Sequence, residues 1–128
     1  MGIAAVNNPG ETVLSGRTEA IEAIESALEA QEVQTRRLTV SHAFHSPLME
    51  PMLEAFGTTA GAIEMKTPAL PLVSNLTGEW MESAPDAAYW EQHVRQGVRF
   101  ADGLRTLDDL SSAIFIEIGP HTALLGMG

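Results

Sequence analysis

Ser41-His42-Ala43-Phe44-His45-Ser46-Pro47-Leu48-Met49-Glu50 is the stretch around which the rest of the chain is organised. Apolar residues alternate with polar ones over 36–44, which predicts a strand. Ser46 followed by Pro47 is typical of a helix start, because serine caps the first turn and proline suits the first helical position. The stretch therefore predicts a strand, a short loop and then a helix. Such a junction presents side chains from a rigid base.

The chain before this junction predicts a hairpin and a helix. Short apolar runs at 3–6 and 12–16 are typical of strands, and the Asn-Asn-Pro-Gly sequence at 7–10 shapes the turn between them. Thr18 is a good helix cap, and the periodicity predicts a helix over 18–30 with Ile21, Ile24 and Leu28 on its buried face. The first part of the chain thus reads as α+β.

The chain after the junction alternates helices with strands. The helix that follows Pro47 has an irregular first turn, because Pro51 lacks an amide hydrogen, and its regular part is expected after Pro51. Strands are predicted at 70–76 and 113–118, and helices from about residue 88 and over 98–110, separated at Gly97. Gly119-Pro120-His121 opens a last helix. This pattern is typical of α/β folds, in which such apolar strands are buried on both faces of a parallel sheet.

Composition excludes several classes of protein. The 128 residues are 45% hydrophobic, contain no cysteine and carry a net charge of -10. We expect one domain or a piece of a larger one, in the cytoplasm, without disulfides or zinc-thiolate sites. The negative charge disfavours nucleic acid and anionic membranes as partners, and no apolar run is long enough to span a bilayer. The abrupt start on a strand indicates that the chain was cut from something longer.

The four histidines are the candidates for chemistry. His42 and His45 have no third ligand at the usual spacing, so no metal site is expected. His45 would precede a helix N-terminus, which favours a neutral ring able to act as a base, but no Gly-x-Ser-x-Gly nucleophile is present. From the residues alone, a structural role for His45 is therefore favoured. His93 reads as part of an amphipathic helix and His121 as a helix-start residue.

Residues 41–49 also resemble the segment that holds the substrate signature and the catalytic histidine in polyketide synthase acyltransferase domains. Further motifs of that family follow in the family's order along essentially the whole chain: Ala4-Ala5-Val6-Asn7-Asn8-Pro9, Val13-Leu14-Ser15-Gly16, Pro71-Leu72-Val73-Ser74-Asn75-Leu76-Thr77-Gly78, Tyr89-Trp90 with Val98-Arg99-Phe100, and Glu117-Ile118-Gly119-Pro120-His121.

The resemblance implies a transferase that moves a malonyl-type unit from coenzyme A to the phosphopantetheine thiol of an acyl carrier protein. It assigns His45 as the catalytic base and acid, oriented by the backbone carbonyl around Asn75. It assigns His42, Ala43 and Phe44 to substrate binding, with bulky Phe44 favouring malonyl over methylmalonyl. A methyl contact is worth about 1–3 kcal/mol, so this triplet alone would select modestly. No bound cofactor is implied; the coenzyme A thioester is a substrate.

The resemblance also implies the fold. Residues 1–44 would belong to an incomplete ferredoxin-like small subdomain, and 45–128 to the C-terminal part of an α/β-hydrolase-like large subdomain. The family's nucleophilic serine and substrate-binding arginine have no counterpart in this sequence. We therefore expect no turnover from the chain alone, and expect a missing N-terminal part as its partner. The alternative is a non-catalytic α+β module that binds a partner, or an inactive fragment.

Overall fold

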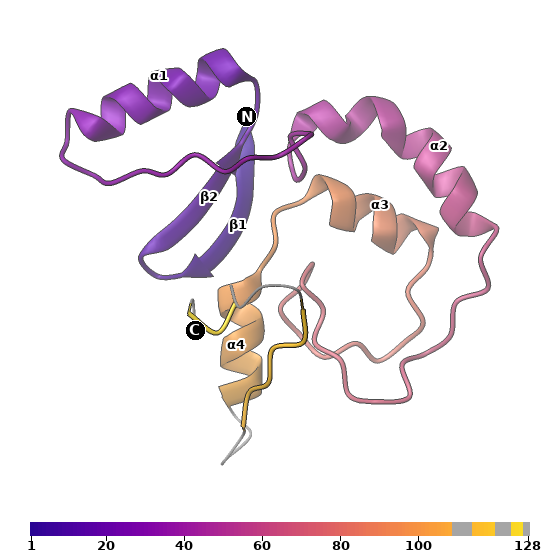
Figure 1. Cartoon of the computed structure of the whole chain (residues 1–128). Coiled ribbons are helices and arrows are strands. Elements are labelled where there is room, and N and C mark those ends of the chain that lie inside the picture. The colour runs from indigo at the N-terminus through magenta and orange to yellow at the C-terminus, as the bar shows by residue number, and fades with distance from the viewer. Residues whose placement is uncertain (109–113, 120–123, 127–128) are drawn as a thin grey trace.

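The computed structural model describes residues 1–108, 114–119 and 124–126. The elements within these ranges are β1 (Gly2–Asn8), β2 (Glu11–Ser15), α1 (Thr18–Glu29), the 3-10 turn η1 (Pro47–Met49), α2 (Glu50–Gly61), α3 (Ala87–Arg95) and α4 (Phe100–Asp108). Figure 1 shows α1 beside the hairpin, α2 next to α3, and α4 below the hairpin. The described chain thus combines helices with one small sheet.

The predicted hairpin is confirmed. β1 runs antiparallel to β2, with Ile3 opposite Leu14. In the turn, the Oδ1 atom of Asn8 accepts a hydrogen bond of 2.9 Å from the amide of Gly10. An asparagine side chain that bonds the backbone two residues on stabilises such a turn.

Val98 joins the other edge of β1. Its amide donates to the carbonyl of Ala4 at 2.8 Å, and its carbonyl accepts from the amide of Val6 at 3.0 Å. This pairing is parallel. β1 therefore lies between β2 and Val98, and it holds the segment between α3 and α4 against the sheet. α4 packs on β1, with Ala101 buried.

The structure confirms the predicted cap of η1 and corrects the predicted starts of α1 and α2. Ser46 caps η1 as expected, since its Oγ atom accepts from the amide of Leu48 at 3.2 Å. The irregular first turn is also confirmed, but α2 begins at Glu50, just before Pro51 rather than after it. A proline there does no harm, because the first amides of a helix have no intrahelical partner. The prediction that Thr18 caps α1 was wrong: Thr18 is its first helical residue, after Arg17.

Three predicted strands do not form in the described ranges. Residues 36–44 and 114–118 have no regular structure, and in 70–76 only Val73 makes an isolated bridge, to Trp80. Alternation or a run of apolar residues sets which faces a strand can bury, but a strand also needs a neighbouring strand to receive its hydrogen bonds. The described part of the chain supplies no such neighbour here. Ala113 and the predicted helix start at Pro120 and His121 lie outside the described residues.

Within the described ranges, no helix is both long enough and apolar enough to cross a membrane.

Candidate active site

His45 has a fixed and unusual backbone. It is the last residue of the loop that contains 41–44, and Ser46, the cap of η1, follows it directly. Its φ of 59° lies in the left-handed region, which costs a residue other than glycine about 1–2 kcal/mol. Its amide donates to the carbonyl of Val94 at 3.0 Å, near the end of α3. This bond helps to offset the strain and holds the loop against α3.

The imidazole of His45 is oriented by a backbone carbonyl. Its Nδ1 atom lies 2.7 Å from the carbonyl oxygen of Gln96. A carbonyl can only accept, so the neutral ring carries its proton on Nδ1 and donates it there. Nε2 then has the free lone pair. A histidine in this tautomer can take a proton from a group placed at Nε2.

The orienting carbonyl is not the one expected. The prediction that the carbonyl around Asn75 orients this ring was wrong, because Nδ1 bonds the Gln96 carbonyl. The Asn75 carbonyl accepts from the amide of Arg99 at 2.8 Å. Gln96 takes its place for a local reason. It is the C-cap of α3 and has an extended backbone, with φ -91° and ψ 157°, so it no longer follows the helix. Its carbonyl is therefore available to the loop that carries His45.

The segment 96–99 is itself held at several points. Val98 pairs with β1, and the amide of Arg99 donates to Asn75. Just before Val98, Gly97 lies so close to β1 that a Cβ atom there would be 2.5 Å from the carbonyl oxygen of Ile3. Asn75 thus anchors the segment that orients His45, although it does not contact the ring.

His42, Ala43 and Phe44 are brought together beside His45. The ring of Phe44 lies 6.0 Å from that of His42 and 6.5 Å from that of His45, between centroids. Phe44 is 45% exposed, so its ring is open to a ligand next to the base. Their part in substrate selection stays a prediction.

Ser46 holds the loop through two hydrogen bonds of its hydroxyl group. It is fully buried, and its Oγ atom donates to the carbonyl of Ala43 at 2.7 Å while accepting from the amide of Leu48. One hydroxyl therefore satisfies a backbone group on each side of His45. This pair of hydrogen bonds holds the loop and the helix start in one arrangement.

A cluster of rings on α3 lies against His45. The centroid of His93 is 6.2 Å from that of His45, 5.4 Å from Trp90 and 6.0 Å from Tyr89. Trp90 donates to the sulfur of Met65, and the hydroxyl of Tyr89 bonds Ser74 at 2.9 Å. Burial lowers the pKa of His93 below its usual range, and positive charge on His45 lowers this pKa further.

Comparison with known proteins identifies the family. The model of the family described as "Acyl transferase domain" matches residues 1–128. The chain belongs to the acyl transferase domain family.

Relatives of this acyl transferase sequence are polyketide synthases and domains from them. It is 48% identical over 130 residues to the phenolphthiocerol synthesis polyketide synthase type I Pks15/1 of Mycobacterium marinum, covering 98% of this chain and 6% of the relative. The acyltransferase domain from the second module of the salinomycin polyketide synthase is 54% identical with a TM-score of 0.78, covering 84% of this chain and 25% of that one. The acyl transferase domain of SpnD, in complex with 2-(pent-4-yn-1-yl)malonyl, is 35% identical with a TM-score of 0.93, covering 98% and 31%.

These matches settle the broad class. The chain is an acyltransferase sequence of the polyketide synthase type, with the mixed α/β content of its solved neighbours. It spans about 6% of the curated relative and 25–31% of the two solved chains.

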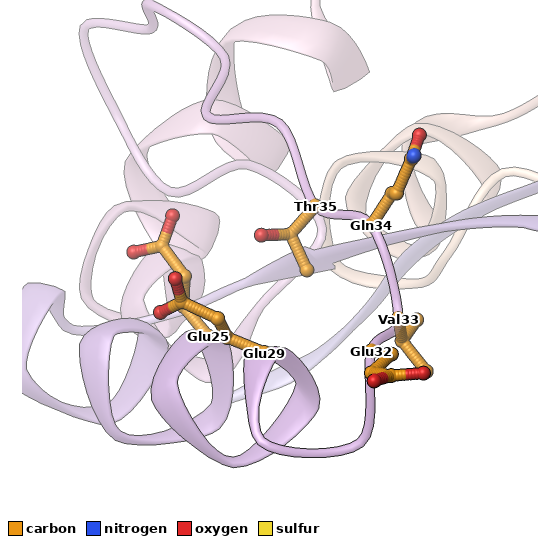
Figure 2. Close-up of a pocket in the computed structure, with 6 residues that line it drawn as sticks. All are labelled: Glu25, Glu29, Glu32, Val33, Gln34 and Thr35. Atoms are coloured by element: carbon orange, nitrogen blue, oxygen red, sulfur yellow. The ribbon is translucent and has the colours of Figure 1, made fainter.

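His45 does not line either of two cavities in the described part of the acyl transferase chain. One, of about 440 Å³, lies between α1 and residues 32–35; Figure 2 shows Glu25 and Glu29 projecting from α1, with Thr35 on the facing loop. It contains no predicted site residue, and its carboxylates would repel an anionic substrate. The other, of about 400 Å³, is mostly apolar and lies between residues 71–80 and α4; it includes Asn75.

Sequence reasoning missed two neighbours of His45. The contribution of Gln96 is a backbone carbonyl, which has no residue signature, so no sequence pattern points to it. His93 was assigned only to an amphipathic helix, yet its ring faces His45. The Tyr89-Trp90 motif four and three residues before it was the available signal, since residues at that spacing share a helix face. Among the described residues, no group of three metal-ligating side chains is placed to hold an ion.

Proposed function

We propose that this chain supplies the acid-base half of an acyltransferase site in polyketide biosynthesis. The reaction moves a malonyl-type unit from coenzyme A to the phosphopantetheine thiol of an acyl carrier protein. It passes through an acyl-serine whose serine belongs to residues outside these 128. No cofactor is bound by this chain, and the coenzyme A thioester is the substrate. The SpnD domain, solved with a malonyl derivative, supports this substrate class by similarity.

One observation carries the proposal: the bond of 2.7 Å between Nδ1 of His45 and the Gln96 carbonyl. It leaves Nε2 as the basic nitrogen of the ring. A general base must present its lone pair to the proton that it removes, and a fixed tautomer meets that need.

His45 would move one proton in each half-reaction. In the first, Nε2 accepts the proton of the serine hydroxyl while the serine oxygen attacks the thioester carbon. The tetrahedral intermediate collapses, the carbon–sulfur bond breaks, and the imidazolium returns the proton to the departing thiolate. In the second, Nε2 takes the proton of the phosphopantetheine thiol, whose sulfur attacks the acyl-serine. Collapse then releases the serine oxygen, which regains the proton from His45.

The triplet before His45 would shape the space beside the malonyl unit. Phe44 is exposed and its ring lies next to the base, so it is placed to limit the bulk at the malonyl C2 carbon. One contact of this kind discriminates by about 1–3 kcal/mol. We therefore propose a preference for malonyl, with other residues contributing to selectivity.

The remaining part of the acyltransferase domain would cover surfaces that are open here. Leu70, Ile114, Ile116 and Ile118 are 78–94% exposed, which is unusual for large apolar side chains. They fit an α/β-hydrolase-like large subdomain, and the hairpin with α1 fits an incomplete ferredoxin-like small one. The same exposed residues also suit a non-catalytic module that binds a partner, so activity has to separate the two.

A reconstitution assay tests the proposal. The chain is mixed with a polypeptide that carries the rest of the domain and its Gly-His-Ser-x-Gly sequence, and malonyl transfer to a carrier protein is followed. His45→Ala should lower kcat about 10²- to 10⁴-fold. Gln96→Ala is the matched control, because it keeps the orienting carbonyl and should retain activity. Equal rates for the unaltered chain and the His45→Ala variant would exclude His45 as the base; no transfer by any mixture would favour the non-catalytic module.

A further inference from the structure

His93 lies against the base without a defined role. Its ring meets that of His45 at an interplanar angle of 68°, edge to face, with 6.2 Å between centroids. It is held on its other sides by Tyr89 and Trp90, which are bonded to Ser74 and Met65. The ring is thus part of a braced cluster and not a loose surface side chain.

We propose that His93 is a positioning residue for His45: its uncharged ring supports one side of the imidazole and, with the Gln96 carbonyl, keeps Nε2 directed toward the substrate. The carbonyl bond fixes which nitrogen carries the proton only while it is made, and a single bond lets the ring swing out of it, which frees both nitrogens. A second contact from a rigid ring removes that freedom. This inference rests on the proposed role of His45 as the base.

The surroundings of His93 keep it uncharged. α3 packs against η1 and α2, so the relevant ionisable groups come from these elements and from the loop that carries His45. On α2 and α3, Glu50 and Arg95 pair with each other at 2.9 Å, and Glu91 lies against Gly57. Among the described residues, no carboxylate forms an ion pair with His93. Partial burial also lowers its pKa, so it stays neutral when His45 takes a proton.

Neutrality matters because His45 becomes a cation during each half-reaction. A positive charge this close disfavours protonation of its neighbour and lowers the pKa of His93 further. A flat, neutral side chain at position 93 should therefore suffice for positioning, whereas a cation should disturb the base. This distinction separates positioning from simple packing.

Nuclear magnetic resonance of the isotopically labelled 128-residue chain tests the inference without any turnover. The ring nitrogen shifts of His45 report its tautomer and its titration midpoint. We expect one tautomer, with the proton on Nδ1, in the unaltered chain and in His93→Phe. We expect the second tautomer to appear in His93→Ala, and the midpoint to fall by about one unit in His93→Lys. His42→Ala is the matched control and should change neither quantity.

Two results would overturn the inference. One is a single, unchanged tautomer in His93→Ala; the other is an unchanged midpoint in His93→Lys. Amide spectra and Trp90 fluorescence verify that each variant is folded. If His93→Ala unfolds, His93→Leu replaces it, because leucine fills the space without a planar ring, and the same outcomes apply.

Reconstituted activity gives a second readout. His93→Ala should lower kcat about tenfold with KM unchanged, and His93→Phe should restore it, as for other residues that orient a functional ligand. A rise in KM alone would contradict positioning. Because the resonance experiment uses no substrate, a chain that fails to transfer malonyl can still pass or fail it, so the two proposals are tested separately.

Discussion

The loop around His45 and the segment 114–118 are opposites in how they are held. Around His45, backbone groups bond within the chain: its amide to Val94, its ring to Gln96, and Ser46 to both sides of the loop. Residues 114–118 have no strand neighbour in the described part of the chain, and Ile114 and Ile118 are 88% and 94% exposed. One region is held by hydrogen bonds within this chain; the other leaves large apolar side chains exposed.

The two regions illustrate two different requirements: a base must be oriented, and an apolar strand must be buried. Orienting a base needs a few short hydrogen bonds between segments that are near in space, and 41–46 and 94–99 provide them. Burying an apolar strand needs whole neighbouring strands. Under the proposed function, the acid-base half of the site would therefore form before the rest of the domain docks on it. Substitutions in each region can test whether the two are as independent as this comparison requires.

Ser46→Ala should have the largest effect. It removes a helix cap and leaves the part-buried Ala43 carbonyl without this partner, which should lower the free energy of unfolding by about 2 kcal/mol. Denaturant unfolding of the purified chain measures this. Ser41→Ala is the control, because Ser41 is exposed and its hydroxyl bonds only the His42 ring among the described residues. Equal losses in both variants would show that Ser46 does not hold the loop.

Sequence anticipated the first region better than the second for a physical reason. The cap at Ser46 and the break at Gly97 depend on neighbours in the chain, so local chemistry predicts them. The strands at 36–44, 70–76 and 113–118 were inferred from alternation and apolar runs, which do not say whether a partner strand exists.

The residues of the candidate site were also predictable only where a local sequence motif identifies them. His45 could be chosen from its motif, and His42, Ala43 and Phe44 follow from it. The ring's acceptor was misassigned to Asn75 because any residue has a carbonyl, and only the extended backbone at Gln96 makes its carbonyl the one that reaches the ring.

Replacing His45 itself should reveal the strain in its backbone. Glycine adopts a φ near 59° freely and alanine does not, so His45→Gly should be more stable than His45→Ala by about 1 kcal/mol. Both variants lack the imidazole, so the comparison isolates the backbone. The free energies of unfolding of the two variants give the difference. Equal stabilities would mean that residue 45 leaves the left-handed region once the ring bond is lost.

The pH dependence of stability should show a smaller contribution from His93. Burial lowers its pKa in the folded chain, so below the unfolded value of about 6.5 the unfolded state binds the proton more readily. The stabilisation of the folded chain by neutral His93 is therefore fully present above that pH. It is lost as the pH falls from there toward the folded pKa, and at still lower pH the protonation of His93 no longer changes the free energy of unfolding. His93→Phe should remove this part of the curve, which lies below about pH 6.5. Parallel curves for the two chains would contradict the expected burial.

Ile118→Asn should have the smallest effect on the isolated chain and is the sharpest test of the comparison. Because Ile118 is 94% exposed, its replacement should change the free energy of unfolding by less than about 0.5 kcal/mol. In the reconstituted domain the same change should weaken association by about 1.5–3 kcal/mol, the value of one buried isoleucine. Association is measured by titrating one polypeptide with the other.

A loss of stability in the isolated chain as large as that of Ser46→Ala would mean that residues 114–118 already pack on this chain, and the two regions would not differ in kind. If the substitution weakens only the association, it acts only where a second surface covers residues 114–118. That result is expected because an apolar segment is stabilised by the removal of its side chains from water, and not by its local backbone.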